Sequence, residues 1–173
     1  MKPWELVHQR PGPSGHVRVV TCNYLLPDGR TAEWDLLAEE DSVAIVGITS
    51  GGEVVLVRQY RPGPGRILDE LPGGGIEQGG APAEAARREL LEETGYAGRV
   101  QIVGATWVAG HSMRRRWAAL ATDCQRQGSP APDDGEVCEP VVMSLPEFRT
   151  HLRSGQLTNA NVGYMCLDHA GLL

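Results

Sequence analysis

Three glutamates and an arginine stand close together near the middle of the sequence, at Arg88, Glu89, Glu92 and Glu93. They lie in a run rich in Ala, Arg, Glu and Leu, which are residue types that favour a helix. At about 100° per residue, the three carboxylates fall within about a quarter turn of one another. Because like charges so close together repel, the pattern predicts either a bound Mg²⁺ or Mn²⁺, which prefer oxygen ligands, or a solvated acidic face. Arg88 is one turn before Glu92 and is placed to hold a carboxylate.

The segment before this cluster must position the predicted helix. Residues 73–80 are rich in glycine, which lets the chain fold tightly. Pro82 suits the first turn of a helix, where its missing N–H costs nothing. Gly95 suits the position that ends a helix. We therefore predict a glycine-rich loop that leads into a helix of about three turns.

The loop and the helix together resemble the Nudix box, in which a Gly and then a Glu precede Arg-Glu-aliphatic-x-Glu-Glu-x-Gly-apolar at fixed intervals. The matching positions are Gly74, Arg88, Glu89, Leu90, Glu92, Glu93, Gly95 and Tyr96. The one departure is Gly80, where the family has a Glu.

This resemblance implies a hydrolase that cleaves a pyrophosphate bond with the help of Mg²⁺ or Mn²⁺. It implies that the metal ligands are the carbonyl of Gly73 and the side chains of Glu89, Glu92 and Glu93. It implies that the catalytic residues include Arg88, Glu92 and Glu93. A second hypothesis follows from Gly80, because a chain that lacks one acidic group is also compatible with a catalytically weak module that binds a nucleotide metabolite and regulates a partner.

A further carboxylate is expected from the acidic stretch Asp133-Asp134-Gly135-Glu136-Val137-Cys138-Glu139. The stretch resembles an acidic segment that precedes a strand in the ADP-ribose pyrophosphatase-like branch of the family. That resemblance implies that Glu136 swings onto the metal site as the catalytic base, unless the base comes from the box itself. The alternative is a solvated acidic loop.

Substrate recognition is expected from Trp34, Arg61 and Glu70, which lie in segments that resemble the same branch, and from Arg114, in a segment that departs from it. Trp34 is a candidate for stacking on a nucleobase, or else it packs at a dimer interface. Arg61 is expected to bind phosphate or ribose, or only to pair with Glu70. Arg114 belongs to an arginine cluster that either contacts the ligand or pairs with surface acids. Residues 107–116 lack the proline that many ADP-ribose-specific members carry, so other nucleoside diphosphate derivatives remain open.

The composition excludes several classes of protein. The chain has 173 residues and a net charge of −6, so it has no basic surface of the kind that binds nucleic acid. No apolar run is long enough to span a membrane, and the N-terminus lacks a signal-peptide core. The four cysteines show no metal-binding spacing. We therefore expect a cytoplasmic protein with buried thiols, whose partner is a small nucleotide substrate.

The order of predicted elements indicates an α/β sandwich with a mixed sheet between helices, the arrangement that the Nudix resemblance also implies. Residues 1–41 are expected to form an irregular lead-in over residues 1–15, followed by a β-hairpin. Residues 42–173 are expected to form the Nudix domain, with helices after Ser144 and from about Asn159. Because the front hairpin is too small to bury a core alone, we expect it to pack on the main domain or in a homodimer.

Overall fold

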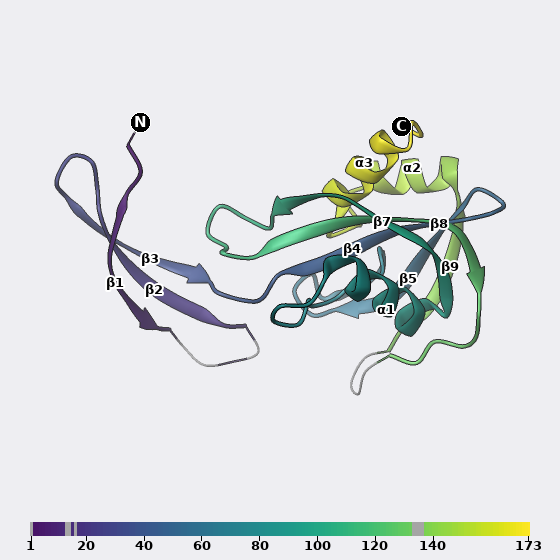
Figure 1. The fold of residues 1–173 in the computed structure, drawn as a ribbon, viewed down its shortest axis with the longest axis horizontal. Helices are drawn as coiled ribbons and strands as arrows, with labels where there is room; N and C mark the ends of the chain where they lie inside the picture. Colours follow the sequence, from purple (N-terminus) through teal and green to yellow (C-terminus); the bar gives the residue numbers. More distant parts are fainter. Residues whose placement is uncertain (1, 13–14, 16, 133–136) are drawn as a thin grey trace. The chain divides into compact units, whose positions relative to one another are not determined.

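The computed structural model describes residues 2–12, 15, 17–132 and 137–173. Its contacts divide the chain into two compact units, which are treated separately below (Figure 1). The first unit comprises residues 1–41 and 107–115. The second comprises residues 42–106 and 116–173.

The first unit contains an antiparallel sheet in the order β1-β2-β3. Its strands are β1 (Glu5–Pro11), β2 (Val19–Leu25) and β3 (Thr31–Leu37). The prediction of an irregular lead-in was wrong for β1, which pairs along β2. All seven residues of β1 are exposed, so no alternation of buried and exposed side chains marks this strand in the sequence.

The second unit is built on a six-stranded mixed sheet in the order β6-β5-β4-β8-β7, with β9 paired to β5. The strands are β4 (Ser42–Thr49), β5 (Glu53–Arg61), β6 (Arg66–Glu70), β7 (Tyr96–Trp107), β8 (Arg115–Arg126) and β9 (Glu139–Ser144). Strands β4 and β8 are parallel, whereas β5 is antiparallel to β4, β6 and β9. The predicted mixed sheet is therefore confirmed.

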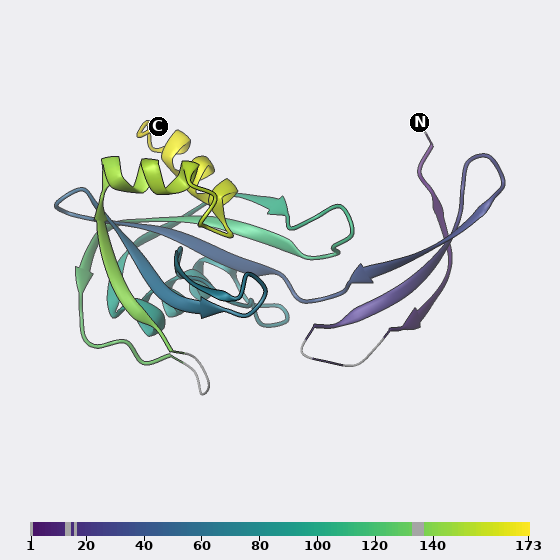
Figure 2. The ribbon, with the colours of Figure 1, turned by 180° about the vertical axis from the view of Figure 1, so that it is seen from behind.

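Three helices cover the two faces of this sheet (Figures 1 and 2). They are α1 (Pro82–Thr94), α2 (Leu145–Arg153) and α3 (Ala160–His169). Val43 and Ile45 of β4 pack with residues of α1, whereas Ala44 and Val46 pack with residues of α2 and α3. This alternation follows from the two-residue period of a strand, and it gives the predicted α/β/α sandwich.

The remaining composition-based expectations concern the cysteines and the membrane. Cys22, Cys124 and Cys166 are buried, and Cys138 is partly buried. Burial raises the pKa of Cys124 to about 11 and that of Cys166 to about 12, so these two thiols stay protonated and serve as core side chains. Across the described residues, every helix is too short or too polar to traverse a lipid bilayer.

Candidate active site on helix α1

The glycine-rich loop after β6 runs against β4 through backbone hydrogen bonds. The N–H of Val43 donates to the carbonyl of Gly74, and the N–H of Ile45 donates to the carbonyl of Pro72, both at 2.9 Å. A Cβ atom at Gly73 would collide with the carbonyl oxygen of Val43. Only glycine allows the loop to approach β4 this closely.

Helix α1 then turns two carboxylates toward this loop. Glu89 is 8% exposed and Glu93 is 3% exposed, one turn apart on the face that packs against the sheet. A Cβ atom at Gly74 would lie 2.5 Å from the carboxylate carbon of Glu89. The missing side chain at Gly74 therefore leaves the space that the Glu89 carboxylate occupies.

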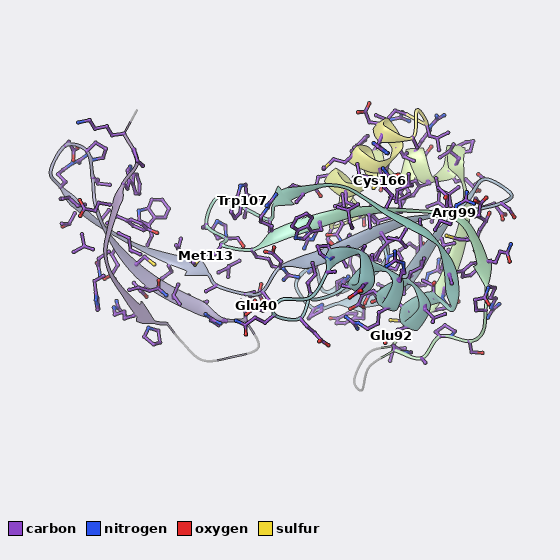
Figure 3. All side chains as sticks on the ribbon, in the orientation of Figure 1. Glu40, Glu92, Arg99, Trp107, Met113 and Cys166 are labelled. Carbon is purple, nitrogen blue, oxygen red and sulfur yellow. The ribbon has the colours of Figure 1, made fainter. Side chains whose placement is uncertain are left out.

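Arg88 ties the acidic cluster together. It donates to Glu89 at 2.6 Å, to Glu92 at 2.8 Å and to the carbonyl of Gly75 at 3.3 Å. Burial alone would lower the pKa of Arg88, but the negative charges of Glu89 and Glu92 outweigh it and raise the pKa. This cluster is on the α1 face of the sheet: Glu92 lies on α1, and Cys166 on α3 lies on the opposite face (Figure 3). The predicted association of Arg88 with a carboxylate is present in the structure.

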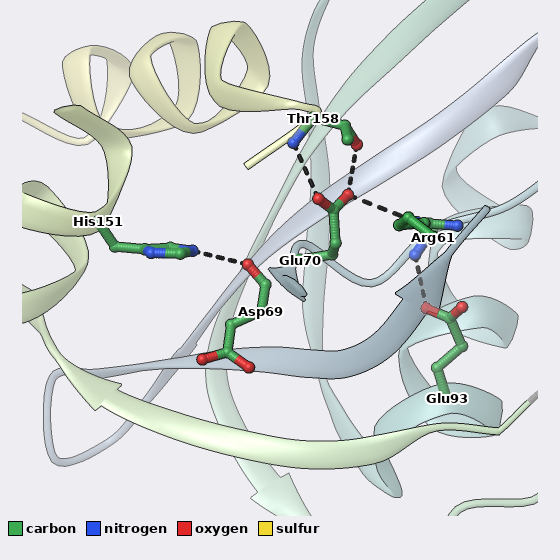
Figure 4. A network of polar contacts seen from close by, with 7 residues as sticks. Arg61, Asp69, Glu70, Glu93, His151 and Thr158 are labelled. Atoms are coloured by element: carbon green, nitrogen blue, oxygen red, sulfur yellow. Dashed lines mark hydrogen bonds and ion pairs between the residues drawn. The ribbon is translucent and has the colours of Figure 1, made fainter. Parts of the chain in front are cut away.

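The second buried carboxylate is held from the loop. The N–H of Gly73 donates to Oε2 of Glu93 at 2.8 Å, a charge-assisted hydrogen bond of the stronger kind. Figure 4 shows this hydrogen bond to Glu93, and beside it Arg61 paired with Glu70. Burying a carboxylate without such a partner would cost several kcal/mol, so the loop helps to make the burial of Glu93 possible.

These residues are suited to a divalent cation, although in the described part of the chain no three His, Cys, Asp or Glu side chains converge on one point. The donors are hard oxygen atoms, which Mg²⁺ and Mn²⁺ prefer. Glu89 and Glu93 are buried one turn apart beside a loop whose backbone lies close by. In the structure, Glu89 accepts a hydrogen bond from the Arg88 guanidinium and Glu93 accepts one from the Gly73 N–H. Both donors carry positive or partial positive charge, as a bound cation would.

The expected substrate residues fall into two groups. Arg61 and Glu70 lie in the second unit, where Nη2 of Arg61 is 3.5 Å from Oε2 of Glu70. The pairing that the sequence left open is therefore present. Trp34 and Arg114 lie in the first unit, where Arg114 pairs with Glu39 at 3.1 Å.

Trp34 lines a cavity of about 340 Å³ in the first unit, together with Trp4, Tyr24, His111 and Met113. The rings of Trp4 and Trp34 are 5.9 Å apart and tilted by 51°. Trp34 is 46% exposed, so part of its ring is accessible to a ligand.

The expected catalytic base Glu136 lies outside the described residues.

One residue of the second unit escaped the sequence analysis. Thr158 donates to Glu70 from its N–H, at 2.9 Å, and from its hydroxyl group. The two residues are 88 positions apart in the sequence, and no motif contains Thr158. No signal in the sequence could have paired them.

Comparison with known proteins identifies the family. The family model described as "NUDIX domain" matches residues 39–162. An "ADP-ribose pyrophosphatase" of Bacillus subtilis is 35% identical over 74 residues, which are 43% of this chain and 40% of that protein. A "Methanol dehydrogenase activator" of Bacillus methanolicus is 39% identical over 71 residues, which are 41% of this chain and 38% of that protein. The chain thus matches about two fifths of the length of each of these relatives.

Among solved structures, the "Crystal structure of ADP compounds hydrolase" superposes with a TM-score of 0.82 and 18% identity. The superposition covers 100% of this chain and 98% of that chain. At this identity the likeness shows the fold, and it extends over both units. With the family model matching most of the chain, the protein belongs to the Nudix hydrolase family.

Proposed function

We propose that this protein hydrolyses the pyrophosphate bond of a nucleoside diphosphate that is linked to a second group, with ADP-ribose or a nucleotide-sugar as substrate. The observation that carries the proposal is the pair of buried carboxylates, Glu89 and Glu93, one turn apart beside the Gly73–Gly74 loop. The name of the Bacillus subtilis relative, an ADP-ribose pyrophosphatase, supports the choice of substrate.

The proposed cofactor is Mg²⁺ or Mn²⁺. Its ligands would be the carbonyl of Gly73 and the side chains of Glu89, Glu92 and Glu93. When bound, such an ion polarises a phosphoryl oxygen, lowers the pKa of bound water and offsets the charge of an anionic substrate. Arg88 would hold Glu89 and Glu92 in place through the contacts described above.

In the proposed reaction, water attacks one phosphorus atom and the bond from that atom to the bridging oxygen breaks. The products are two phosphate monoesters. A carboxylate accepts the proton of the attacking water, and the candidates are Glu92, Glu93 and Glu136. Arg61, whose partner Glu70 stands three residues before Gly73, supplies positive charge for a phosphate of the substrate.

The base of the nucleotide is proposed to stack on Trp34, whose exposed ring lines the aromatic cavity of the first unit. Such stacking is worth about 1–3 kcal/mol per base. Arg114 is proposed as a further contact to the substrate, in exchange for its ion pair with Glu39.

The first unit is also proposed to form a homodimer interface. Among its described residues, the buried apolar side chains are those of Val20, Cys22 and Ala38, whereas large apolar side chains such as Leu6 and Val7 are exposed on β1. A second copy of the chain would cover them. Analytical ultracentrifugation at micromolar concentration should give the mass of a dimer; a sedimenting monomer would remove this part of the proposal.

The central test is Glu93→Gln, which keeps the shape of the side chain but removes its charge. We expect turnover of ADP-ribose with Mg²⁺ to fall by more than about 100-fold, since even residues that only support metal ligands are worth 10–100-fold. Circular dichroism should show a folded protein. The matched control is Glu53→Gln, at the exposed start of β5, which should keep the wild-type rate. Wild-type turnover by Glu93→Gln across ADP-ribose and nucleotide-sugars would overturn the proposal.

A second candidate is a Nudix-fold module that binds a nucleotide metabolite and regulates a partner. The match to a protein named methanol dehydrogenase activator favours it, as does the glycine at position 80. Titration calorimetry with ADP-ribose, combined with an assay of product release, separates the two candidates. Tight binding without metal-dependent release would support the module, whereas release that requires Mg²⁺ supports the enzyme.

A further inference from the structure

The carboxylate of Glu70, at the end of β6, is completely buried. A buried charge is costly unless it is paired and hydrogen-bonded. Glu70 has such partners on two sides, because it accepts two hydrogen bonds from Thr158 and lies 3.5 Å from Nη2 of Arg61. Figure 4 shows Glu70 between Thr158 and Arg61. The carboxylate therefore links a residue outside the Nudix box to Arg61, from a position three residues before Gly73, whose N–H donates to Glu93.

Arg61 is the point at which this link reaches the candidate active site. Its guanidinium pairs with Glu70, which stands three residues before Gly73, the loop residue whose N–H donates to Glu93. Its Nε atom is buried and has no hydrogen-bond partner among the described residues. A buried donor left over in this way is unusual in a folded protein. Arg61 is thus held by Glu70 and still has unused hydrogen-bonding capacity.

Thr158 is held firmly at the other end of the link. It lies in the connection between α2 and α3, and two further contacts with β6 flank it, one from the end of α2 and one from the connection itself. The ring Nε2 of His151 is 2.7 Å from the carbonyl oxygen of Asp69, and Arg66 donates to the side chain of Gln156 at 3.1 Å. These contacts keep the backbone of the connection against β6, so the N–H and the hydroxyl of Thr158 stay aimed at Glu70.

We propose that Thr158 is a positioning residue for the active site, which acts through Glu70 to hold Arg61 where it binds a phosphate of the substrate. The inference rests on the proposed function, in which Arg61 binds phosphate. Without the Thr158 hydroxyl, Glu70 would accept only the N–H of Thr158 on that side. Its carboxylate would then attract the Arg61 guanidinium more strongly and move it from the position in which it binds phosphate. The α2–α3 connection, which contributes no residue to the Nudix box, would then set the affinity for substrate.

The test compares Thr158→Val, which removes the hydroxyl and keeps the shape, with Thr158→Ser, which keeps the hydroxyl. Thr150→Val on α2 is the matched control, because the Thr150 hydroxyl donates only to the carbonyl of Pro146 in its own helix. With ADP-ribose and Mg²⁺, we expect Thr158→Val to raise KM about tenfold, the usual worth of a hydrogen bond to a charged group. We expect kcat to change by less than about threefold, since binding that is equal in the ground and transition states appears in KM. Thr158→Ser and Thr150→Val should behave as wild type.

Arg61→Lys provides the second measurement. If Thr158 acts through Arg61, adding Thr158→Val to Arg61→Lys should change KM by less than about twofold, because residues in one network are not additive. An unchanged KM in Thr158→Val, equal losses in Thr158→Val and Thr158→Ser, or full additivity with Arg61→Lys would each overturn the inference. If Thr158→Val does not fold, Glu70→Gln replaces it, measured alone and in combination with Arg61→Lys.

Glu93→Gln, assayed alongside, separates this inference from the proposed function. Loss of turnover in Glu93→Gln with a normal KM in Thr158→Val would refute only the role of Thr158. Wild-type turnover in Glu93→Gln would refute the proposed function, whatever Thr158→Val shows.

Discussion

Helices α1 and α2 cover opposite faces of the same sheet, and they differ in what they bury and in how they begin. Helix α1 buries the carboxylates of Glu89 and Glu93 beside small residues, whereas α2 buries Phe148 and Leu152. Helix α1 starts at Ala81 with no side-chain cap, while α2 starts with a complete capping box. The difference indicates that α2 is specified by local contacts and apolar packing, and that α1 depends on the loop beside it.

The two faces therefore divide stability and chemistry between them. The α2–α3 face packs large apolar side chains, including Phe148, Leu152 and Leu167, against the sheet. The α1 face packs mainly Ala, Val, Ile and Leu around two charges. Burying a charge is unfavourable unless it is compensated, so the α1 face contributes less to folding and more to binding. The following predictions test this division.

The largest effect on stability should come from Phe148→Ala. Phe148 is completely buried in the cluster beneath α2 and α3. Removing a buried phenyl ring typically costs about 3–5 kcal/mol, because apolar contact is lost and a cavity remains. Urea denaturation should show this loss in the free energy of unfolding, and Phe148→Leu should lose less.

The same variant should leave the chemistry nearly intact. At a temperature where Phe148→Ala remains folded, we expect kcat for ADP-ribose within about twofold of wild type, since Phe148 belongs to the cluster on the face of the sheet opposite α1. A large fall in kcat of the folded variant would show that the two faces are coupled through the sheet, and the proposed division would then be wrong.

The structure also shows which parts of the site could be predicted from the sequence. The contact of Arg88 with Glu92 was predictable, because residues four positions apart on a helix are neighbours. Its contact with Glu89 was not, because adjacent helical residues do not face each other. The limits of α1 were predictable from Pro82 and from Gly95, whose φ of 73° is left-handed. These features depend only on short-range spacing.

Other parts could not be predicted, and each for a physical reason. The pairing of Thr158 with Glu70 spans 88 positions, and only the folded chain brings the two together. Strand β1 gains its structure from pairing with β2 and buries nothing of its own. Arg61 had two possible roles in the sequence, and its ion pair with Glu70 leaves room for both, since its buried Nε atom has no hydrogen-bond partner among the described residues.

A smaller effect, confined to activity, is expected for Gly74→Ala. The new methyl group would lie 2.5 Å from the carboxylate carbon of Glu89 and 2.7 Å from Oε2, so the carboxylate must move. Because that carboxylate ends a flexible side chain, we expect the free energy of unfolding to change by less than about 1 kcal/mol. Turnover with Mg²⁺ should fall about 10-fold or more, as the ligand leaves its place.

Gly128→Ala is the control for that substitution, since a Cβ atom there meets nothing within 4 Å. It should match wild type in both activity and stability. If Gly74→Ala keeps full activity, the position of Glu89 beside the loop is not required for catalysis. If it unfolds the protein, the α1 face contributes more to stability than the comparison with α2 implies.

The smallest effect should come from Glu147→Gln in the capping box of α2. The side chain of Glu147 accepts hydrogen bonds from the hydroxyl and the N–H of Ser144, at 2.6 and 2.9 Å, and these lower its pKa. A carboxylate whose pKa is lowered by folding stabilises the protein above its unfolded pKa of about 4.3, and the stabilisation is lost as the pH falls through the folded pKa. Wild type should therefore be slightly more stable than Glu147→Gln at pH 7, and urea midpoints should converge as the pH falls below about 4. Midpoints that differ equally at pH 7 and pH 3 would mean that the ionised carboxylate is not what starts α2. The local specification that distinguishes α2 from α1 would then have to come from the Ser144 hydroxyl alone.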